Sequence, residues 1–294
     1  KLRDARHPLL WYNNNKVGKK VEPLSIILQP KERILIISGP NAGGKSVCLK
    51  TVGLLQYMFQ CGLAVTAKEG SEMSIFKDMF VDIGDEQSIE NDLSTYSSHL
   101  TSMKTLVENC GGKSLVLIDE FGGGTEPQYG GAIAESILLE INKKNVFAVI
   151  TTHYANLKKL AENTSGLING AMRYDLDELR PLYQLDMGKP GSSFALEIAN
   201  KIGLPKHILD LAKQKVGLSQ VNFDKLMAQA QNDQAKLDEA LTKAKLIIFI
   251  SPNAIECTMR AIADAGMVWN ELVNPQTFVG VVGHSSRDAL LRHG

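Results

Sequence analysis

The 294-residue sequence lacks the features that mark zinc-binding, secreted and membrane proteins. Its four cysteines include no C-x-x-C pair, which argues against a zinc site and is typical of reduced thiols in a cytosol. No apolar run approaches the roughly 18 residues of a membrane span, and no signal peptide is visible. We therefore expect a cytoplasmic protein without membrane contacts.

The chain also lacks an excess of charge of either sign. Lys and Arg together number 32, as do Asp and Glu, so no global basic field indicates nucleic-acid binding. Any contact with DNA or RNA must then come from a local patch or from regions outside this chain. Because the sequence begins at Lys1 without a methionine, we expect it to be a fragment of a longer protein.

The most informative stretch is ILIISGPNAGGKS, residues 34–46. Its four leading aliphatic residues are typical of a strand buried on both faces of a parallel sheet. Gly39 to Ser46 then has the spacing G-x-x-x-x-G-K-S of a phosphate-binding loop, and the following VCLKTVGLLQYMF predicts a helix whose positive end lies behind the phosphates. A chance glycine-rich turn is the alternative, which the flanking strand and helix disfavour. We infer that the chain binds a nucleoside triphosphate.

Two residues of this loop have expected chemical tasks. Lys45 would reach the β- and γ-phosphates, and the Ser46 hydroxyl would bind Mg²⁺. The other nucleotide-binding residues that we expect in and beside the loop are Gly39, Pro40, Asn41, Ala42, Gly43, Gly44 and Val47.

A second aliphatic run, residues 114–118, ends in two carboxylates, Asp119 and Glu120. This pattern predicts both at the carboxyl edge of a strand beside the phosphate loop, where ligands gather in open α/β sheets. Asp119 would hold Mg²⁺, and Glu120 would polarise the attacking water as general base. Such a run is a weak signal alone, but here both motifs serve the same Mg²⁺–phosphate group.

Two further segments supply candidate residues. In DLSTYSSHL, residues 92–100, Ser94 or Thr95 is expected to cap a helix that continues through Val107. His153 follows an aliphatic run, residues 146–150, so it would lie near the γ-phosphate and sense hydrolysis, with a purely structural histidine as the alternative. The glycine triplet 122–124 predicts a mobile turn or the close approach of another backbone.

These elements predict an α/β fold with a mainly parallel central sheet flanked by helices over residues 1–216. We expect short strands and turns in residues 1–33 and an antiparallel pair in 167–188. Residues 217–245 predict a solvated helix or the start of a coiled coil. Residues 246–294 predict a small β-α-β-α unit, which is too short to bury a substantial core of its own.

With these motifs in place, residues 1–220 resemble the ATPase domain of the MutS family, a phosphate-loop NTPase of the ABC-like type. The resemblance rests on GPNAGGKS, DIGDEQSIENDLSTYSSHL, LVLIDEFGGGTEP, the TTH at 151–153 and GSSFALEIANKIGLP, in this order. DIGDEQSI and STYSSH resemble the bacterial paralogue branch, associated with recombination control and the rescue of stalled ribosomes, more than the mismatch-recognising branch. The family's DNA-clamp and lever regions have no counterpart in this chain.

The resemblance implies ATP and Mg²⁺ as cofactors and a composite site between two protomers that meet head to tail. Ser94, with Thr95 beside it, would act on the nucleotide of the partner protomer. In the other half, Asn41 and Lys45 would contact phosphates, Ser46 and Asp119 would serve Mg²⁺, Glu120 would be the base and His153 the switch. The glycine triplet would lie at the dimer interface, and DNA or a ribosome would be bound through regions outside this chain.

Other readings of the chain remain open. A transporter-type ABC ATPase would need an LSGGQ-like signature, whereas this chain has LSTYSSH. A nucleotide-binding switch without hydrolysis is disfavoured by Glu120. Residues 246–294 resemble a piece of a uroporphyrinogen-III synthase through FISPNAIE and VVGHSSRDALLRHG, and since only part of that fold would be covered, we expect no synthase activity.

Overall fold

The computed structural model describes residues 1–40, 42–83, 92–175, 178–192, 194–216, 236, 240, 243, 246–249, 251–264, 278–281 and 284–292. The chain divides into two compact units, Lys1–Leu218 and Ser219–Gly294. Among the residues that the structure describes, no helix has the length and apolar character needed to cross a membrane.

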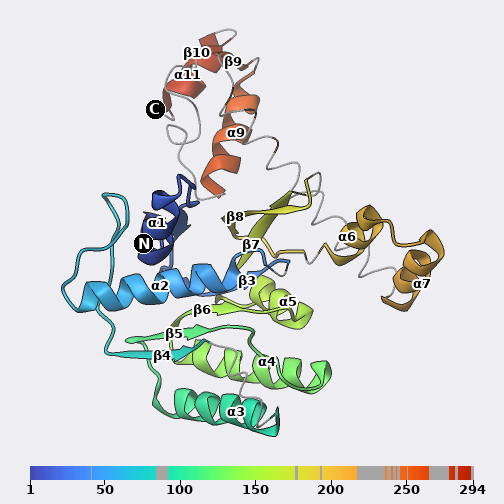
Figure 1. Ribbon diagram of the computed structural model, residues 1–294. Coiled ribbons are helices and arrows are strands. Elements are labelled where there is room, and N and C mark those ends of the chain that lie inside the picture. Colours follow the sequence, from blue (N-terminus) through green and yellow to red (C-terminus); the bar gives the residue numbers. More distant parts are fainter. Residues whose placement is uncertain are drawn as a thin grey trace. The chain divides into compact units, whose positions relative to one another are not determined.

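The first unit is built around a six-stranded sheet with the strand order β4-β5-β6-β3-β7-β8 (Figure 1). All neighbouring strands are parallel except β7 and β8. This confirms the mainly parallel sheet and the antiparallel pair that the sequence predicts. The strands are β3 (Glu32–Ser38), β4 (Asp78–Asp82), β5 (Ser114–Ile118), β6 (Phe147–Thr151), β7 (Gly166–Asp175) and β8 (Arg180–Met187).

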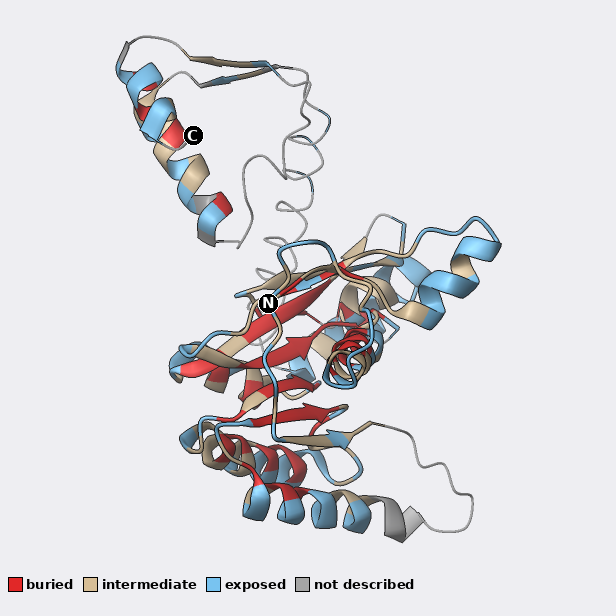
Figure 2. Ribbon diagram, turned by 90° about the vertical axis from the view of Figure 1, so that its left-hand side faces the viewer, coloured by how far each residue is buried: buried red, intermediate tan, exposed pale blue. Residues whose placement is uncertain are grey.

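Alternate side chains of β3 enter two different cores. Ile34 and Ile36 pack with residues of α3 (Asp92–Asn109), α4 (Pro127–Lys143) and α5 (Ala155–Asn163). Leu35 and Ile37 pack on the other face with residues of α2 (Lys45–Gln60). All four are fully buried, and the central strands are red in Figure 2. Each such burial contributes about 1.5–3 kcal/mol, which is why the run is continuously apolar rather than alternating.

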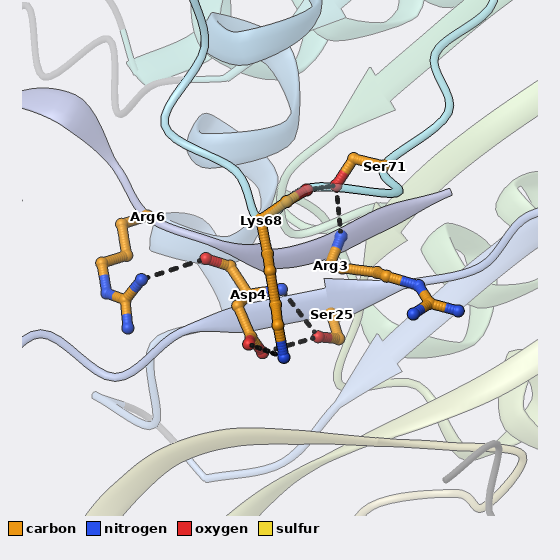
Figure 3. A network of polar contacts seen from close by, with 6 residues as sticks. All are labelled: Arg3, Asp4, Arg6, Ser25, Lys68 and Ser71. Carbon is orange, nitrogen blue, oxygen red and sulfur yellow. Dashed lines mark hydrogen bonds and ion pairs between the residues drawn. The ribbon is translucent and has the colours of Figure 1, made fainter. Parts of the chain in front are cut away.

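A small antiparallel sheet joins β1 (Leu2–Ala5) to β2 (Leu24–Ile26). The segment 66–72 lies alongside β1 and the residue after it, and the Arg6 N–H donates to the Thr66 carbonyl at 2.9 Å. Polar side chains tie these pieces together: the Lys68 ammonium lies 3.4 Å from an Asp4 carboxylate oxygen, and the Asp4 N–H donates to the Ser25 hydroxyl at 3.0 Å (Figure 3). The strand β2, which precedes β3 in the chain, therefore belongs to a separate sheet.

The expectation of only strands and turns in residues 1–33 is wrong, because α1 (Pro8–Lys16) is a helix. His7 caps it through Nδ1, which accepts a hydrogen bond from the Leu10 N–H at 3.4 Å. Pro8 occupies the first helical position, where a missing N–H costs nothing. No residue of α1 is buried, so the sequence holds no apolar stripe of helical period that would have indicated it.

The rest of the described chain comprises the helices that end the first unit, and the second unit. After the sheet come α6 (Ala195–Ile202) and α7 (Lys206–Val216). The described part of the second unit includes the parallel strands β9 (Leu246–Phe249) and β10 (Phe278–Val281) and the helices α9 (Pro252–Asp264) and α11 (His284–Arg292). Their chain order confirms the β-α-β-α pattern. The helix predicted for 217–245 lies outside the described residues, apart from 236, 240 and 243, which are helical.

Candidate nucleotide-binding site

The candidate site residues follow the carboxyl ends of parallel strands, which meet at one edge of the sheet. The phosphate loop follows β3, Asp119 and Glu120 follow β5, and His153 follows β6 by two residues. The structure adds the strand order: β6 lies between β5 and β3 (Figure 1). The last residue of β6, Thr151, is therefore placed between the two motifs.

The phosphate loop has the backbone that its glycines predict. Gly39 and Gly44 have φ angles of +146° and +95°, and a Cβ on Gly39 would lie 2.9 Å from the Cβ of Met172. Ala42 also has a positive φ, +60°, which is strained for a residue with a side chain. Helix α2 begins at Lys45 with Gly44 as its N-cap, so its N-terminal end opens on the loop. Asn41 lies outside the described residues.

The Lys45 side chain is hydrogen-bonded to the backbone of its own phosphate loop. Its side chain is buried, and Nζ donates to the carbonyl oxygens of Gly39 and Pro40 at 3.1 and 3.0 Å. Burial lowers the pKa of Lys45, while the nearby carboxylates of Glu120 and Asp119 act in the opposite direction. The ammonium is thus positioned between the loop and the two carboxylates that follow β5.

Ser46, Asp119 and Glu120 line one cavity of about 380 Å³. Among the described residues, no group of three or more His, Cys, Asp or Glu side chains could hold a metal by itself. A hydroxyl and a carboxylate in one cavity nevertheless fit Mg²⁺, which binds through one or two carboxylates together with substrate phosphates. The donor set therefore suits a metal that arrives with a nucleotide.

One hydroxyl connects the residues that follow β5. Thr151 Oγ1 accepts a hydrogen bond from the Glu120 N–H at 2.8 Å and donates to Asp119 Oδ1 at 2.5 Å. The Thr151 carbonyl also accepts from the Phe121 N–H at 2.8 Å. Glu120 itself has a φ of +50°, a backbone conformation that costs a non-glycine residue about 1–3 kcal/mol and clusters at functional sites.

The glycine triplet makes a close backbone contact within the chain. A Cβ on Gly130, in the first turn of α4, would lie 2.3 Å from the Gly122 carbonyl oxygen. The Tyr154 hydroxyl donates to that same carbonyl at 2.9 Å. A Cβ on Gly122 would in turn lie 3.0 Å from the Gly130 carbonyl oxygen, so the triplet permits the approach of another backbone, that of α4.

The His153 side chain is accessible to solvent, but its imidazole is partly desolvated, and its pKa is lowered from the ordinary 6.5. Partial burial is the main cause, followed by the positive charge of Lys45, while Glu120 acts in the opposite direction. The neutral imidazole is therefore favoured at pH 7. Its role as a γ-phosphate sensor stays a prediction.

The expected helix cap at Ser94 or Thr95 is wrong. Helix α3 begins at Asp92, so both residues lie inside its first turns. Helix starts are difficult to place within two residues from sequence. The side chains of Ser94 and Thr95 lie outside the described residues, and their action on a partner's nucleotide stays a prediction.

The sequence did not identify four residues at this site. Besides Thr151, His99 on α3 places its Nδ1 2.9 Å from Asp82 Oδ2, and both residues line the cavity. Tyr183 on β8 lies beside the phosphate loop, with its Cδ1 3.0 Å from the position of a Cβ on Gly44. Asp82 and Thr151 could have been suspected from the sequence, because each is a polar residue at the end of an expected parallel strand.

The sheet order and the phosphate loop define an α/β domain of the phosphate-loop nucleotide-binding class. Residues 35–220, more than half of the chain, match the family model described as MutS domain V. The chain therefore belongs to the MutS family, as the motifs had indicated.

Similar proteins include bacterial relatives named endonuclease MutS2. The one from Bacillus velezensis is 42% identical over 247 residues, which cover 84% of this chain and 31% of the relative. The one from Thermomicrobium roseum is 44% identical over 240 residues, covering 82% of this chain and 29% of the relative. The chain thus spans about three tenths of the length of these relatives. None of these findings supports the resemblance of residues 246–294 to a uroporphyrinogen-III synthase.

Proposed function

We propose that the first unit binds ATP with Mg²⁺ and hydrolyses it. The observation that carries the proposal is the single cavity lined by Ser46, Asp119 and Glu120. The Lys45 charge is close enough to both carboxylates to be influenced by them. A phosphate-binding loop, a hydroxyl and two carboxylates are the set that phosphoryl transfer to water requires.

Each side chain then has a distinct task. The Lys45 ammonium balances negative charge on the β- and γ-phosphates, and the α2 N-terminus adds its backbone N–H groups. Ser46 and Asp119 would hold Mg²⁺, which supplies further charge neutralisation when it is bound. The Glu120 carboxylate accepts a proton from the attacking water. His153, neutral at pH 7, donates one hydrogen bond to the γ-phosphate and senses the loss of that group.

We further propose that two copies form the composite site. Ser94, with Thr95, would act on the partner's nucleotide, and the glycine triplet would lie at the interface. Five exposed apolar side chains support a protein contact on α6, α7 and their connection: Ile202, Leu204, Ile208, Leu211 and Val216. The resulting cycle of closing and opening would act as a clamp on branched or mismatched DNA, or on stalled ribosomes, through regions outside this chain. A cytoplasmic location belongs to the same proposal.

The test is phosphate release per protomer at increasing protein concentration, with Mg²⁺ and saturating ATP. A composite site requires two chains, so specific activity should rise and then plateau as dimers form. Glu120→Gln should abolish release, whereas Glu162→Gln, an exposed carboxylate on α5, should not. Ser94→Ala should abolish the rise, and Ser102→Ala, two turns along the same helix, serves as its control. Equal release by the wild type and Glu120→Gln would overturn the assigned base.

The alternative function is a nucleotide-binding switch that does not hydrolyse ATP in isolation. It predicts ATP binding without phosphate release at any concentration. A transporter-type ATPase is disfavoured by the LSTYSSH sequence, as well as by the match to MutS domain V.

A further inference from the structure

Thr151 occupies a buried position between the two motifs of the candidate site. It is the last residue of β6, its side chain is fully buried, and it pairs with Ile37 at the end of β3. Its neighbour on the other side, β5, leads directly into Asp119 and Glu120. Among the strands that the structure describes, no other borders both the strand of the phosphate loop and the strand of the carboxylates.

The Thr151 hydroxyl uses both of its hydrogen-bonding capacities on these carboxylate residues. A hydroxyl has one proton to donate, and here it goes to Asp119 Oδ1. The oxygen accepts the Glu120 N–H at 2.8 Å. Because one bond fixes a carboxylate oxygen and the other a backbone amide, the hydroxyl couples the orientation of Asp119 to the backbone of Glu120.

Each of the two Thr151 hydrogen bonds stabilises a group that would otherwise be strained or free to rotate. Glu120 has a φ of +50°, so its backbone needs external support to stay in that conformation. Asp119 would be free to rotate about its side-chain torsions without a partner for Oδ1, and a rotating carboxylate is a poorer metal ligand. Residues that hydrogen-bond to metal-ligating side chains typically contribute 10–100-fold to metal affinity or activity.

We propose that Thr151 is a positioning residue of the Mg²⁺–nucleotide site, and that its hydroxyl orients Asp119 toward the metal while it holds the Glu120 backbone. This inference rests on the proposed function, because it assumes that Asp119 serves the metal of a bound nucleotide. The threonine methyl contributes to packing, and the hydroxyl contributes the positioning.

The test separates the hydroxyl from the rest of the side chain. Thr151→Val keeps the volume and removes the hydroxyl, and Thr151→Ser keeps the hydroxyl and removes the methyl. The matched control is Thr152→Val, which removes the adjacent buried hydroxyl that donates to the Phe121 carbonyl at 3.2 Å instead of to a carboxylate. Calorimetry would give the affinity of each protein for the non-hydrolysable analogue AMPPNP, with Mn²⁺ and without metal.

We expect Thr151→Val to weaken binding of Mn²⁺–AMPPNP by about 10–100-fold and to leave binding of metal-free AMPPNP unchanged. Thr151→Ser and Thr152→Val should bind Mn²⁺–AMPPNP as the wild type does. Unchanged Mn²⁺–AMPPNP affinity in a folded Thr151→Val, or an equal loss in Thr151→Ser, would overturn the inference. A wild-type chain that binds neither form of AMPPNP would overturn the proposed function, and this inference with it.

A measurement on the wild type keeps the inference testable if Thr151→Val does not fold. The Glu120 amide should exchange slowly with deuterium, because its N–H is bonded to a fully buried hydroxyl. Exchange of this amide at the rate of an unprotected backbone would show that the bond is absent and would overturn the inference.

Discussion

His99 Nδ1 lies 2.9 Å from Asp82 Oδ2, and this contact joins helix α3 to the end of strand β4. Both side chains are partly buried. The Asp82 carbonyl also accepts a hydrogen bond from the Asp119 N–H at 2.9 Å. One residue thus links the strand of the carboxylates to the helix whose first turns carry Ser94 and Thr95.

His99→Ala should lower the stability of the first unit by about 1 kcal/mol, the usual net contribution of a partly buried hydrogen bond. For a unit of this size we expect the Tm to fall by about 2–4 °C in thermal unfolding. The control is Lys104→Ala on the same helix. Its exposed ion pair with Glu108, at 3.9 Å, should contribute under about 0.5 kcal/mol. Equal effects of the two changes would show that the Asp82 contact does not hold α3.

Gly130→Ala should destabilise the protein even though alanine is the better helix former. The new Cβ would lie 2.3 Å from the Gly122 carbonyl oxygen, and such overpacking costs about 1–3 kcal/mol, against about 1 kcal/mol gained in helix propensity. The neighbouring change Gly131→Ala is the control, because its Cβ would first meet the side chain of Asn156, at 3.2 Å. We expect urea unfolding to show a clear loss for Gly130→Ala and little or none for Gly131→Ala.

The cysteines on α2 and just after it should differ in reactivity. Cys48 is buried, which raises the pKa of its thiol to about 12, whereas Cys61 is exposed. Since the thiolate is the reactive form, iodoacetamide at pH 8 should modify Cys61 and leave Cys48 unmodified until the protein is denatured. Mass spectrometry of peptides from native and denatured samples would measure this. Equal labelling of both in the native state would mean that α2 does not pack on the sheet as described.

His153 should titrate below pH 6.5, because burial and the Lys45 charge lower its pKa. An NMR titration of the imidazole, assigned with His153→Gln, would give the midpoint. Lys45→Met should move it upward, since a positive neighbour is removed. Just below pH 6.5, His153 is protonated in the unfolded state before it is protonated in the folded state. The free energy of unfolding should therefore decrease as the pH falls through this range. A midpoint above 6.5 would contradict the assigned environment.

Residues 34–37 and 115–118 could be assigned to strands from the sequence because a strand buried on both faces needs apolar side chains along its length. The two motifs then located Lys45, Ser46, Asp119 and Glu120 at one edge, which the structure confirms. Helix α1 was missed because none of its side chains is buried, so nothing selects a helical pattern of apolar residues.

The contacts of Thr151 and of His99 with Asp82 could not be predicted for a different reason. They depend on which strands are neighbours in the sheet and on how a helix lies beside them. The sequence placed the carboxylates beside the phosphate loop but did not give the strand order, and the position of β6 between β5 and β3 is a property of the tertiary fold.

The division of β3 between two cores has a consequence for how substitutions combine. Leu35 and Ile36 are joined by a peptide bond, yet Leu35 packs with α2 and Ile36 with α3, α4 and α5. Free energies of substitution add when residues share no partners and couple when they do. A change at Ile36 should therefore be compensated by repacking at Leu138, about a hundred positions away, more readily than by any change at its own neighbour. Core substitutions in α2 should therefore add to, rather than couple with, core substitutions in α3, α4 and α5.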